Sequence, residues 1–345
     1  MSKEIETRTR VVDSSEPAVL AASGLTRRRQ AWSFLIMNLP LIGMILVVLA
    51  GGAAAPAFFL LANLTSVAEQ SVILILVSMG LSIPMLMRGV DLSSAQITDA
   101  AALMAAALVA HGYPIAVALL APIVLGAIIG AVNGALMGYV GVPAIIGTLG
   151  MMFLVRSGEL IYSKGTEPQI LFTLPQEITG PFLFLAQGKI GPIPMIIILC
   201  AVVVVVMHFL TKSTILGRQM DAVGGNVKAA FFSGVNVKRV FASGFVLSGI
   251  LAALSGITLS SWTGIAAPRG AESYLLDSFV AVYLGTVVTK RGQITILGTL
   301  IGALFVGALN NLLTLLGLGA AEHGILNGAF VLLAMAIGAF RSARS

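Results

Sequence analysis

Three ionisable residues, Asp99, Arg156 and Glu159, lie inside long apolar stretches of this chain, where they could bind a proton, a cation or a hydroxylated solute. Charged side chains are rare and costly in such stretches, so each indicates either a function or a buried structural partner. Asp99 predicts a polar contact to a solute or, alternatively, a buried and hydrogen-bonded or protonated structural residue. Arg156 and Glu159 are three residues apart, which on a helix predicts an ion pair. The alternative for this pair is contact with an external partner or solute.

Catalysis in the chain itself would need converging groups, and the sequence offers none. His111, His208 and His323 are scattered, without metal-ligand spacing or a nucleophile–base pair. The chain also lacks the Gly-x-x-x-x-Gly-Lys-Ser/Thr loop that binds nucleotide phosphates. We therefore expect no catalytic residue, no metal and no cofactor in this chain, which leaves an intramembrane enzyme as a weak alternative.

The composition places most of the chain in lipid. Of its 345 residues, 58% are hydrophobic and only 10% are charged, and the mean hydropathy is +1.01. A soluble domain carries about 25% charged residues. Basic residues are not interleaved with aromatic ones, which argues against nucleic-acid binding. Cys200 is the single cysteine, so an intramolecular disulfide is impossible.

Apolar runs of about 20 residues mark transmembrane helices. The sequence predicts an all-α, polytopic transmembrane helical bundle over residues 32–341, preceded by a cytosolic tail, 1–31. The fourth run is long and rich in glycine, which predicts a strong tilt or a break. The expected spans number about ten: 32–52, 67–87, 92–110, 114–140, 143–162, 191–211, 240–262, 273–289, 293–317 and 323–341.

Positive charge predicts the orientation. If ten spans alternate, most of the 20 lysines and arginines fall on one side, in the tail, at Arg88, in the 212–239 loop, at Lys290 and Arg291, and at the C-terminus. By the positive-inside rule, both termini are then cytosolic.

Ten spans also divide into two sets of five. Because five is odd, the second set would cross the membrane in the opposite orientation to the first. The glycines and asparagine of 126–136 resemble those of 298–312, which favours an inverted repeat with the transport path at its interface. Generic Gly-x-x-x-Gly helix packing is the alternative.

Neutral polar residues in apolar helices can bond between helices or line a path for a polyhydroxy solute. Arg88 and Asp91 either pair across one helical turn or mark a break at which Asp91 or Ser93 caps the next helix. Shaping the path is a further role for this pair. The predicted substrate path consists of Asp91, Ser93, Asp99, Asn133, Thr148, Asn310 and Asn311.

The loop 212–239 is long for a membrane protein and can form a small helix. Asn226 is a good N-cap, and the small residues Ala229, Ala230, Ser233 and Gly234 share one helical face. A small-residue face lets a partner approach the backbone closely, although a solvated basic loop is the alternative.

Several stretches, taken in order, resemble permease subunits of bacterial ABC importers for monosaccharides, of the ribose/galactose/xylose type. The stretches are Gly89-Val-Asp-Leu-Ser93, the Pro143 to Gly150 run, the Thr214 to Val235 loop, and Gly298-Thr-Leu-Ile-Gly-Ala303. The resemblance covers roughly residues 60–340. Arg88 is a departure, because the family has a second glycine there.

The resemblance implies a non-enzymatic subunit that translocates a sugar or related polyol. A periplasmic solute-binding protein would deliver the solute, and a second permease copy or a sister permease would complete a dimer. Cytosolic ATPase subunits, carrying ATP and Mg, would bind the 212–239 loop. The alternative is an ion-coupled secondary transporter with Asp99 as its proton or cation site. The residues expected to couple to the ATPase are Gly217, Arg218, Gly224, Gly225, Asn226, Ala229, Ala230, Ser233 and Gly234.

Overall fold

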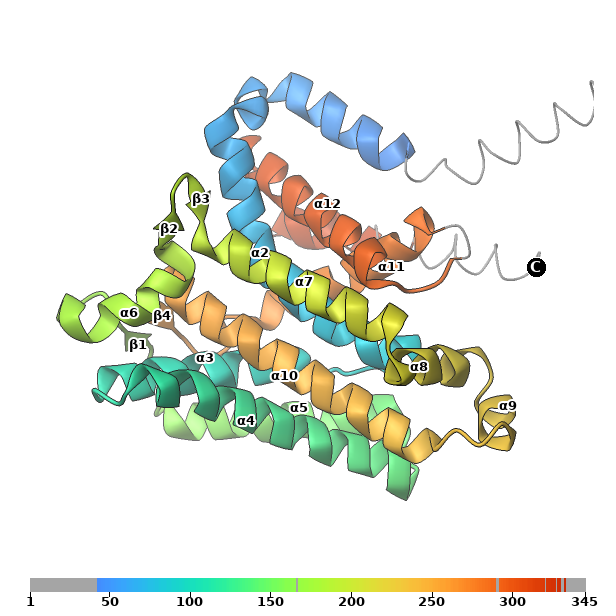
Figure 1. Cartoon of the computed structure of the whole chain (residues 1–345). Coiled ribbons are helices and arrows are strands. Elements are labelled where there is room, and N and C mark those ends of the chain that lie inside the picture. The colour runs from blue at the N-terminus through green and yellow to red at the C-terminus, as the bar shows by residue number, and fades with distance from the viewer. Residues whose placement is uncertain are drawn as a thin grey trace, which may run out of the picture. The chain divides into compact units, whose positions relative to one another are not determined.

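The computed structural model describes residues 42–165, 167–289, 292–319, 321–326, 328–329 and 332. The chain divides into two units, Met1–Ile45 and Leu46–Ser345. Of the first unit, only the start of the apolar helix Ile42–Ala54 is described. The account below concerns the second unit, in which helices predominate (Figure 1).

Long helices make up most of this unit, and two groups of short elements lie at opposite ends of them (Figure 1). The short helices α8 (Ile215–Gly225) and α9 (Val227–Phe232) lie at one end, and α6 (Gln176–Gln187) lies at the other. The remaining helices are η1 (Pro56–Phe59), α2 (Leu61–Leu86), α3 (Ser94–Ala110), α4 (Ile115–Ala135) with its π-helical extension η2 (Leu136–Val140), α5 (Ala144–Tyr162), α7 (Met195–Ser213), α10 (Val237–Thr263), α11 (Glu272–Val288) and α12 (Ile296–Leu315).

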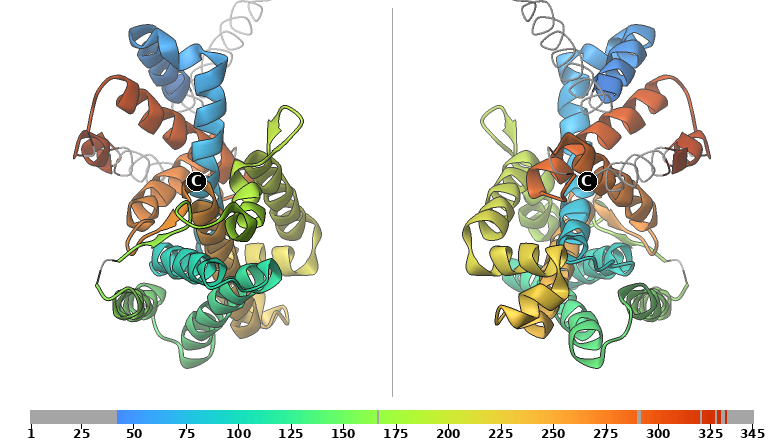
Figure 2. Two further views of the ribbon diagram at one scale, coloured as in Figure 1. Left: turned by 90° about the vertical axis from the view of Figure 1, so that its left-hand side faces the viewer. Right: turned by 90° about the vertical axis from the view of Figure 1, so that its right-hand side faces the viewer.

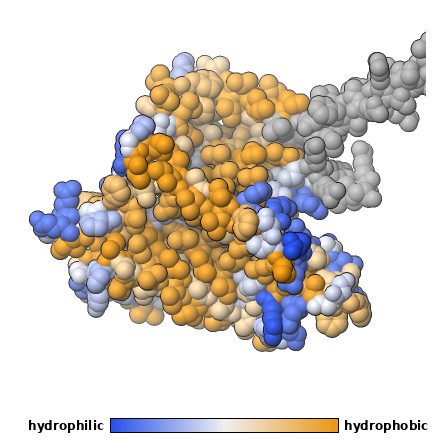
Figure 3. Space-filling model, in the orientation of Figure 1, coloured by the Kyte–Doolittle hydropathy of each residue, from blue (hydrophilic) through white to orange (hydrophobic). Residues whose placement is uncertain are grey.

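Six of the described helices are long and apolar enough to cross a membrane, namely α2, α4 with η2, α5, α7, α10 and α12. The helices Ile42–Ala54 and α3 are apolar but shorter. The first nine predicted runs each overlap a helix, whereas most of the tenth, 323–341, and the tail 1–31 lie outside the described residues. The count of about ten spans and the inverted repeat therefore stay predictions. Figure 3 shows an apolar surface over α7 and α10 between two more hydrophilic ends.

Helices α2 and α10 lie at the centre of this unit. Helix α10 contacts α2, α3 and α4, and α2 also contacts α11 and α12 (Figure 2). A Cβ atom added at Gly126 or Gly130 would collide with backbone carbonyls of α10, at Gly249 and Phe245 respectively. Of the two alternatives predicted for the fourth run, the break is wrong, and a strong tilt stays a prediction. Helix α4 runs on through its glycines, because they form the face that lets it approach α10 closely.

Two small antiparallel sheets lie in the connections at the α6 end. Strand β1 (Gln169–Ile170) pairs with β4 (Ile265–Ala266), in register Gln169 to Ala266. Strand β2 (Lys189–Ile190) pairs with β3 (Ile193–Pro194). The β1–β4 pair joins the connection after α5 to the connection after α10. Near this pair, Phe182 of α6 is fully buried in an apolar cluster that includes Ala266 of β4 and residues of α3, α4 and α10.

Candidate functional site

The connection between α7 and α10 folds into the two short helices α8 and α9. Thr214 caps α8, because its Oγ1 accepts a hydrogen bond from the Gly217 amide at 3.2 Å. Asn226 caps α9 by accepting from the Ala229 amide at 3.0 Å, which confirms the N-cap predicted from the sequence. Gly234 ends α9 with a φ of 83°, a left-handed conformation that favours glycine.

Helix α8 is seated on the ends of the long helices. Its side chains Met220 and Val223 are fully buried. A Cβ added at Gly217 would collide with the Thr211 carbonyl of α7, and one at Gly224 with the Leu86 carbonyl of α2. These two predicted coupling glycines therefore serve close packing of α8 onto α7 and α2. Of the other predicted coupling residues on this helix, Arg218 is exposed and donates to the Ser213 carbonyl at 3.3 Å, and Gly225 is exposed.

Helix α9 presents an apolar surface that sequence reasoning missed. Phe231 and Phe232 are 64% and 84% exposed, and their ring centroids are 5.7 Å apart. Ala230 is buried, so the small-residue face predicted for this helix is divided, with Ala229, Ser233 and Gly234 exposed. The feature of the sequence that could have identified this surface is the Phe-Phe pair within an otherwise polar loop. Large hydrophobic side chains exposed side by side typically mark a protein–protein or membrane interaction site.

The segment 87–93, between α2 and α3, holds a fully buried carboxylate. Asp91 Oδ1 accepts from the amide and hydroxyl of Ser93 at 3.1 and 2.6 Å, and Asp91 Oδ2 accepts from the Ser248 hydroxyl at 2.8 Å. Asn133 donates to Ser93 Oγ at 2.9 Å. Burial raises the pKa of Asp91, while the hydrogen bonds from Ser93 and Ser248 act in the opposite direction.

This segment decides between the two interpretations of Arg88 and Asp91. The helix breaks here, and the structure records no pair between Arg88 and Asp91. Ser93 is the N-cap residue of α3, but α3 has no side-chain cap hydrogen bond. Arg88 instead donates to the carbonyl oxygens of Gly224 and Gly225 in α8, from Nε at 2.7 Å and Nη2 at 3.1 Å.

Four of the predicted path residues converge near this segment. Asp91, Ser93 and Asn133 share one network, and Thr148 donates to the neighbouring Val90 carbonyl at 3.2 Å. All four are fully buried, and they tie the start of α3 to α4, α5 and α10. Ser248 completes the network and had no motif that could identify it.

Asp99 and Glu159 are buried carboxylates with unused hydrogen-bonding capacity. Asp99 is 1% exposed, and its Oδ1 accepts from the Ala271 amide at 2.7 Å. Its Oδ2 and both carboxylate oxygens of Glu159, a residue 4% exposed, have no hydrogen-bond partner among the described residues. The predicted ion pair between Arg156 and Glu159 is wrong. Arg156 Nη1 lies 3.6 Å from Glu272, which also accepts from Arg269 Nε at 2.6 Å.

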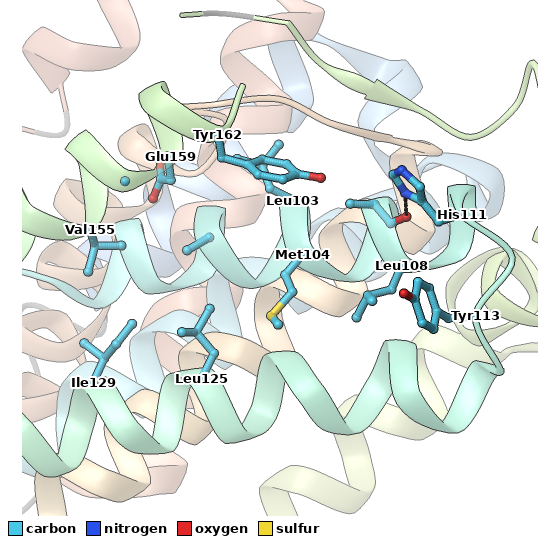
Figure 4. Close-up of a pocket in the computed structure, with 13 residues that line it drawn as sticks. Leu103, Met104, Leu108, His111, Tyr113, Leu125, Ile129, Val155, Glu159 and Tyr162 are labelled. Carbon is cyan, nitrogen blue, oxygen red and sulfur yellow. Dashed lines mark hydrogen bonds between the residues drawn. The ribbon is translucent and has the colours of Figure 1, made fainter. Parts of the chain in front are cut away.

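Glu159 lines a cavity of about 570 Å³ between α3, α4 and α5 (Figure 4). Its carboxylate is turned toward α3, and the cavity walls are mainly apolar, with Met104 of α3 and Leu125 of α4 facing each other. His111, Tyr113 and Tyr162 contribute the other polar groups. The His111 ring is held by a contact of 2.7 Å between Nδ1 and the Ala107 carbonyl.

The remaining predicted path residues lie elsewhere. Asn310 donates to Asp277 Oδ2 at 3.0 Å, which joins α12 to α11. Asn311 accepts from Asn63 at 2.9 Å, which joins α12 to α2. The seven predicted residues therefore do not form one site, and a role in the path stays a prediction. Among the described residues, no group of histidine, cysteine and carboxylate side chains could hold a metal ion.

Residues 63–337 match the family model described as branched-chain amino acid transport system / permease component. The chain belongs to this permease family. It is 32% identical over 315 residues to the ribose import permease protein RbsC of Escherichia coli strain K12, covering 91% of this chain and 97% of that protein. It is 29% identical over 294 residues to the D-allose transport system permease protein AlsC of the same strain, covering 85% and 88%.

A third relative of the permease family is the autoinducer 2 import system permease protein LsrC of Shigella flexneri, which is 30% identical over 297 residues, covering 86% of this chain and 84% of that protein. No solved structure matches the chain. Family membership and the six apolar helices together indicate a multi-pass inner-membrane protein.

Proposed function

We propose that this chain is the membrane-spanning permease subunit of an ATP-binding-cassette importer and that it translocates a sugar or related polyol. A periplasmic binding protein delivers the solute, and two permease chains form the pore. The names of the relatives support this solute class, since they cite ribose, D-allose and autoinducer 2. The family description cites branched-chain amino acids, so leucine belongs among the solutes tested.

The observation that carries the proposal is the contrast between α8 and α9. Helix α8 is fixed to the long helices by buried Met220 and Val223, whereas α9 presents exposed Phe231 and Phe232. A rigid support beneath an exposed aromatic pair suits docking into a groove of a cytosolic subunit, because aromatic anchors dominate protein interfaces. That subunit supplies ATP and Mg, and its movement on ATP binding is transmitted to the helices through α8.

The orientation follows from this assignment. If α8 and α9 are cytosolic, then the α6 end is periplasmic, and both termini are cytosolic if about ten spans are present. The connections 163–190 and 263–272 are then the surface on which the binding protein releases its solute. Asp99, Glu159 and Glu272 lie near that surface, which suits contact with a solute rich in hydroxyl donors.

The docking assignment is tested with Phe232→Ala, and Phe209→Ala is the matched control. Phe209 is 63% exposed on α7, within an apolar helix long enough to span the membrane. Loss of a central aromatic anchor costs about 2 kcal/mol or more of binding free energy, roughly 30-fold in affinity. We expect Phe232→Ala to weaken binding of the ATPase subunit in nanodiscs and Phe209→Ala to leave it unchanged. Unchanged ATPase binding by Phe232→Ala would contradict the assignment.

Replacing Gly234 by a bulky residue is a less specific test. Its φ of 83° would strain any other residue, so a loss of stimulated ATP hydrolysis could arise from unfolding of α9 rather than from a blocked interface.

The second candidate is an ion-coupled secondary transporter, which the unused carboxylate oxygens of Asp99 and Glu159 favour. In that case, Asp99→Asn would abolish uptake by the permease alone in vesicles with an imposed proton or sodium gradient. If uptake by the wild-type chain requires ATPase subunits and does not respond to such gradients, this candidate is refuted.

A further inference from the structure

Arg88 connects the end of α2 to the C-terminal end of α8, across 136 residues of sequence. Its guanidinium donates to the Gly224 and Gly225 carbonyls, at 2.7 and 3.1 Å. The last carbonyl oxygens of a helix have no intrahelical hydrogen-bond donors and carry partial negative charge. A guanidinium group at this end supplies the donors and also compensates the charge. The close contact of Gly224 with the Leu86 carbonyl holds the two helix ends together at the same point.

On its other side, Arg88 is continuous with the buried segment that starts α3. Gly89 packs against the Phe245 ring of α10, since an added Cβ would lie 3.3 Å from it. Val90 accepts from Thr148 of α5, Asp91 accepts from Ser248 of α10, and Ser93 accepts from Asn133 of α4. Because these groups are buried and bonded to one another, a displacement of this segment also acts on α3, α4, α5 and α10.

The backbone at Arg88 is held in an unfavourable conformation. Its φ is 63°, in the left-handed region that glycine adopts freely and other residues rarely adopt. Such outliers persist where the surrounding structure imposes them, and they cluster at functional sites. An arginine at this position gains the two hydrogen bonds to α8, which glycine could not make.

We propose that Arg88 is the positioning residue that transmits movement of α8 and α9 to the segment 89–93 and so to the start of α3. The inference rests on the proposed function, in which ATPase subunits move α9. Helix α9 contacts α8, α8 is bonded to Arg88, and Arg88 leads directly to the network of Asp91. Helix α8 also packs on α2, α7 and α10, and Arg88 is the side chain that hydrogen-bonds it to the segment leading into α3. Its loss removes this link and leaves the helices themselves intact.

The variant Arg88→Gly tests the link without straining the backbone, since glycine adopts a φ of 63° freely. Arg88→Lys keeps the charge but presents a single nitrogen, which loses the forked two-carbonyl geometry. The matched control is Lys212→Ala. Lys212 also contacts α8, through Asp221 at 3.7 Å, but it comes from α7 and does not touch segment 89–93.

The first readout needs no ATPase. Amide hydrogen exchange of the permease alone in nanodiscs should be about fivefold faster at residues 93–98 in Arg88→Gly, because the start of α3 loses its restraint. In Lys212→Ala, faster exchange should be confined to α7 and α8. Exchange at 93–98 that is unchanged in Arg88→Gly would overturn the mechanical link, whatever the transported solute.

The second readout is solute transported per ATP hydrolysed by the complete transporter. The ratio should fall about fivefold in Arg88→Gly, the low end of typical coupling between sites, with Arg88→Lys intermediate and Lys212→Ala unchanged. A wild-type ratio in Arg88→Gly would overturn the transmission role. If the wild-type complex shows no solute-stimulated hydrolysis, the proposed function fails, and the exchange experiment still decides whether Arg88 links α8 to α3.

Discussion

The cap of α9 allows a quantitative test of how this helix is held. Helix α9 has only six residues, Val227–Phe232, so it has few internal hydrogen bonds and depends on its ends. Asn226 Oδ1 accepts from the Ala229 amide at 3.0 Å. Removing such a cap costs about 1 kcal/mol. Because 1.4 kcal/mol is a factor of ten, the open form of α9 should become about fivefold more populated in Asn226→Ala.

Asn236 provides a matched control within the same connection. It caps α10 in the same way, accepting from the Arg239 amide at 3.1 Å, but α10 has 27 residues and packs against several helices. Its interior does not depend on one cap. Asn236→Ala should therefore leave exchange in the middle of α10 unchanged, although it removes the same kind of hydrogen bond.

The assay is hydrogen exchange of the permease in nanodiscs, followed at residues 229–233. We expect exchange there to be about fivefold faster in Asn226→Ala than in wild type, in proportion to the population of the open form. Solute-stimulated ATP hydrolysis should fall with it, because the partner must then order α9 on binding. Unchanged exchange at α9 in Asn226→Ala, or an equal increase there in Asn236→Ala, would refute this reasoning.

Three further predictions concern Gly130 of α4, Ser248 of α10 and Glu272 at the start of α11. Gly130→Ala should destabilise the permease by about 1–3 kcal/mol in thermal unfolding, because the added Cβ would collide with the Phe245 carbonyl. Gly150→Ala should leave the stability unchanged, because a Cβ added there has no atom within 4 Å. Ser248→Ala should cost about 1.5–3 kcal/mol, because it removes a hydrogen bond from the carboxylate of Asp91. Ser243→Ala, which loses only a bond to the Val240 carbonyl, should cost about 1 kcal/mol or less, and equal losses would contradict the role of Asp91. Glu272→Gln should change stability by less than about 1 kcal/mol, and by less still in high salt, because its ion pairs are partly exposed. A larger loss would contradict this account of its ion pairs.

Much of the fold could be predicted because a helix that crosses a lipid bilayer needs about 20 mostly apolar residues in succession. Apolar runs of span length correspond to the long helices α2, α3, α4, α5, α7, α10, α11 and α12, and Asn226 has the expected place at the start of α9. The glycines of α4 predict a strong tilt or a break when composition is the only guide, because composition does not separate flexibility from close packing. Only the position of α10 beside them shows that they form a contact face.

The contacts between distant segments could not be predicted from spacing. Arg88 and Asp91 are close enough in sequence to pair, yet Arg88 bonds to α8 and Asp91 to Ser248, 157 residues away. Arg156 likewise bonds to Glu272 rather than to Glu159. Local spacing identifies neighbours on one helix, but the competing partner comes from tertiary packing. The exposure of Phe231 and Phe232 depends in the same way on which side of α9 rests on α8.

The most direct test of the account is ATP hydrolysis by the reconstituted transporter. The permease would be placed in lipid nanodiscs with its ATPase subunits and a solute-binding protein, and hydrolysis would be measured across pentoses, hexoses, polyols and leucine. We predict that one sugar or polyol stimulates hydrolysis, that all components are required, and that Phe232→Ala reduces the stimulation at limiting ATPase concentration. Uptake driven by an ion gradient through the permease alone, without any ATPase subunit, would contradict the central claim.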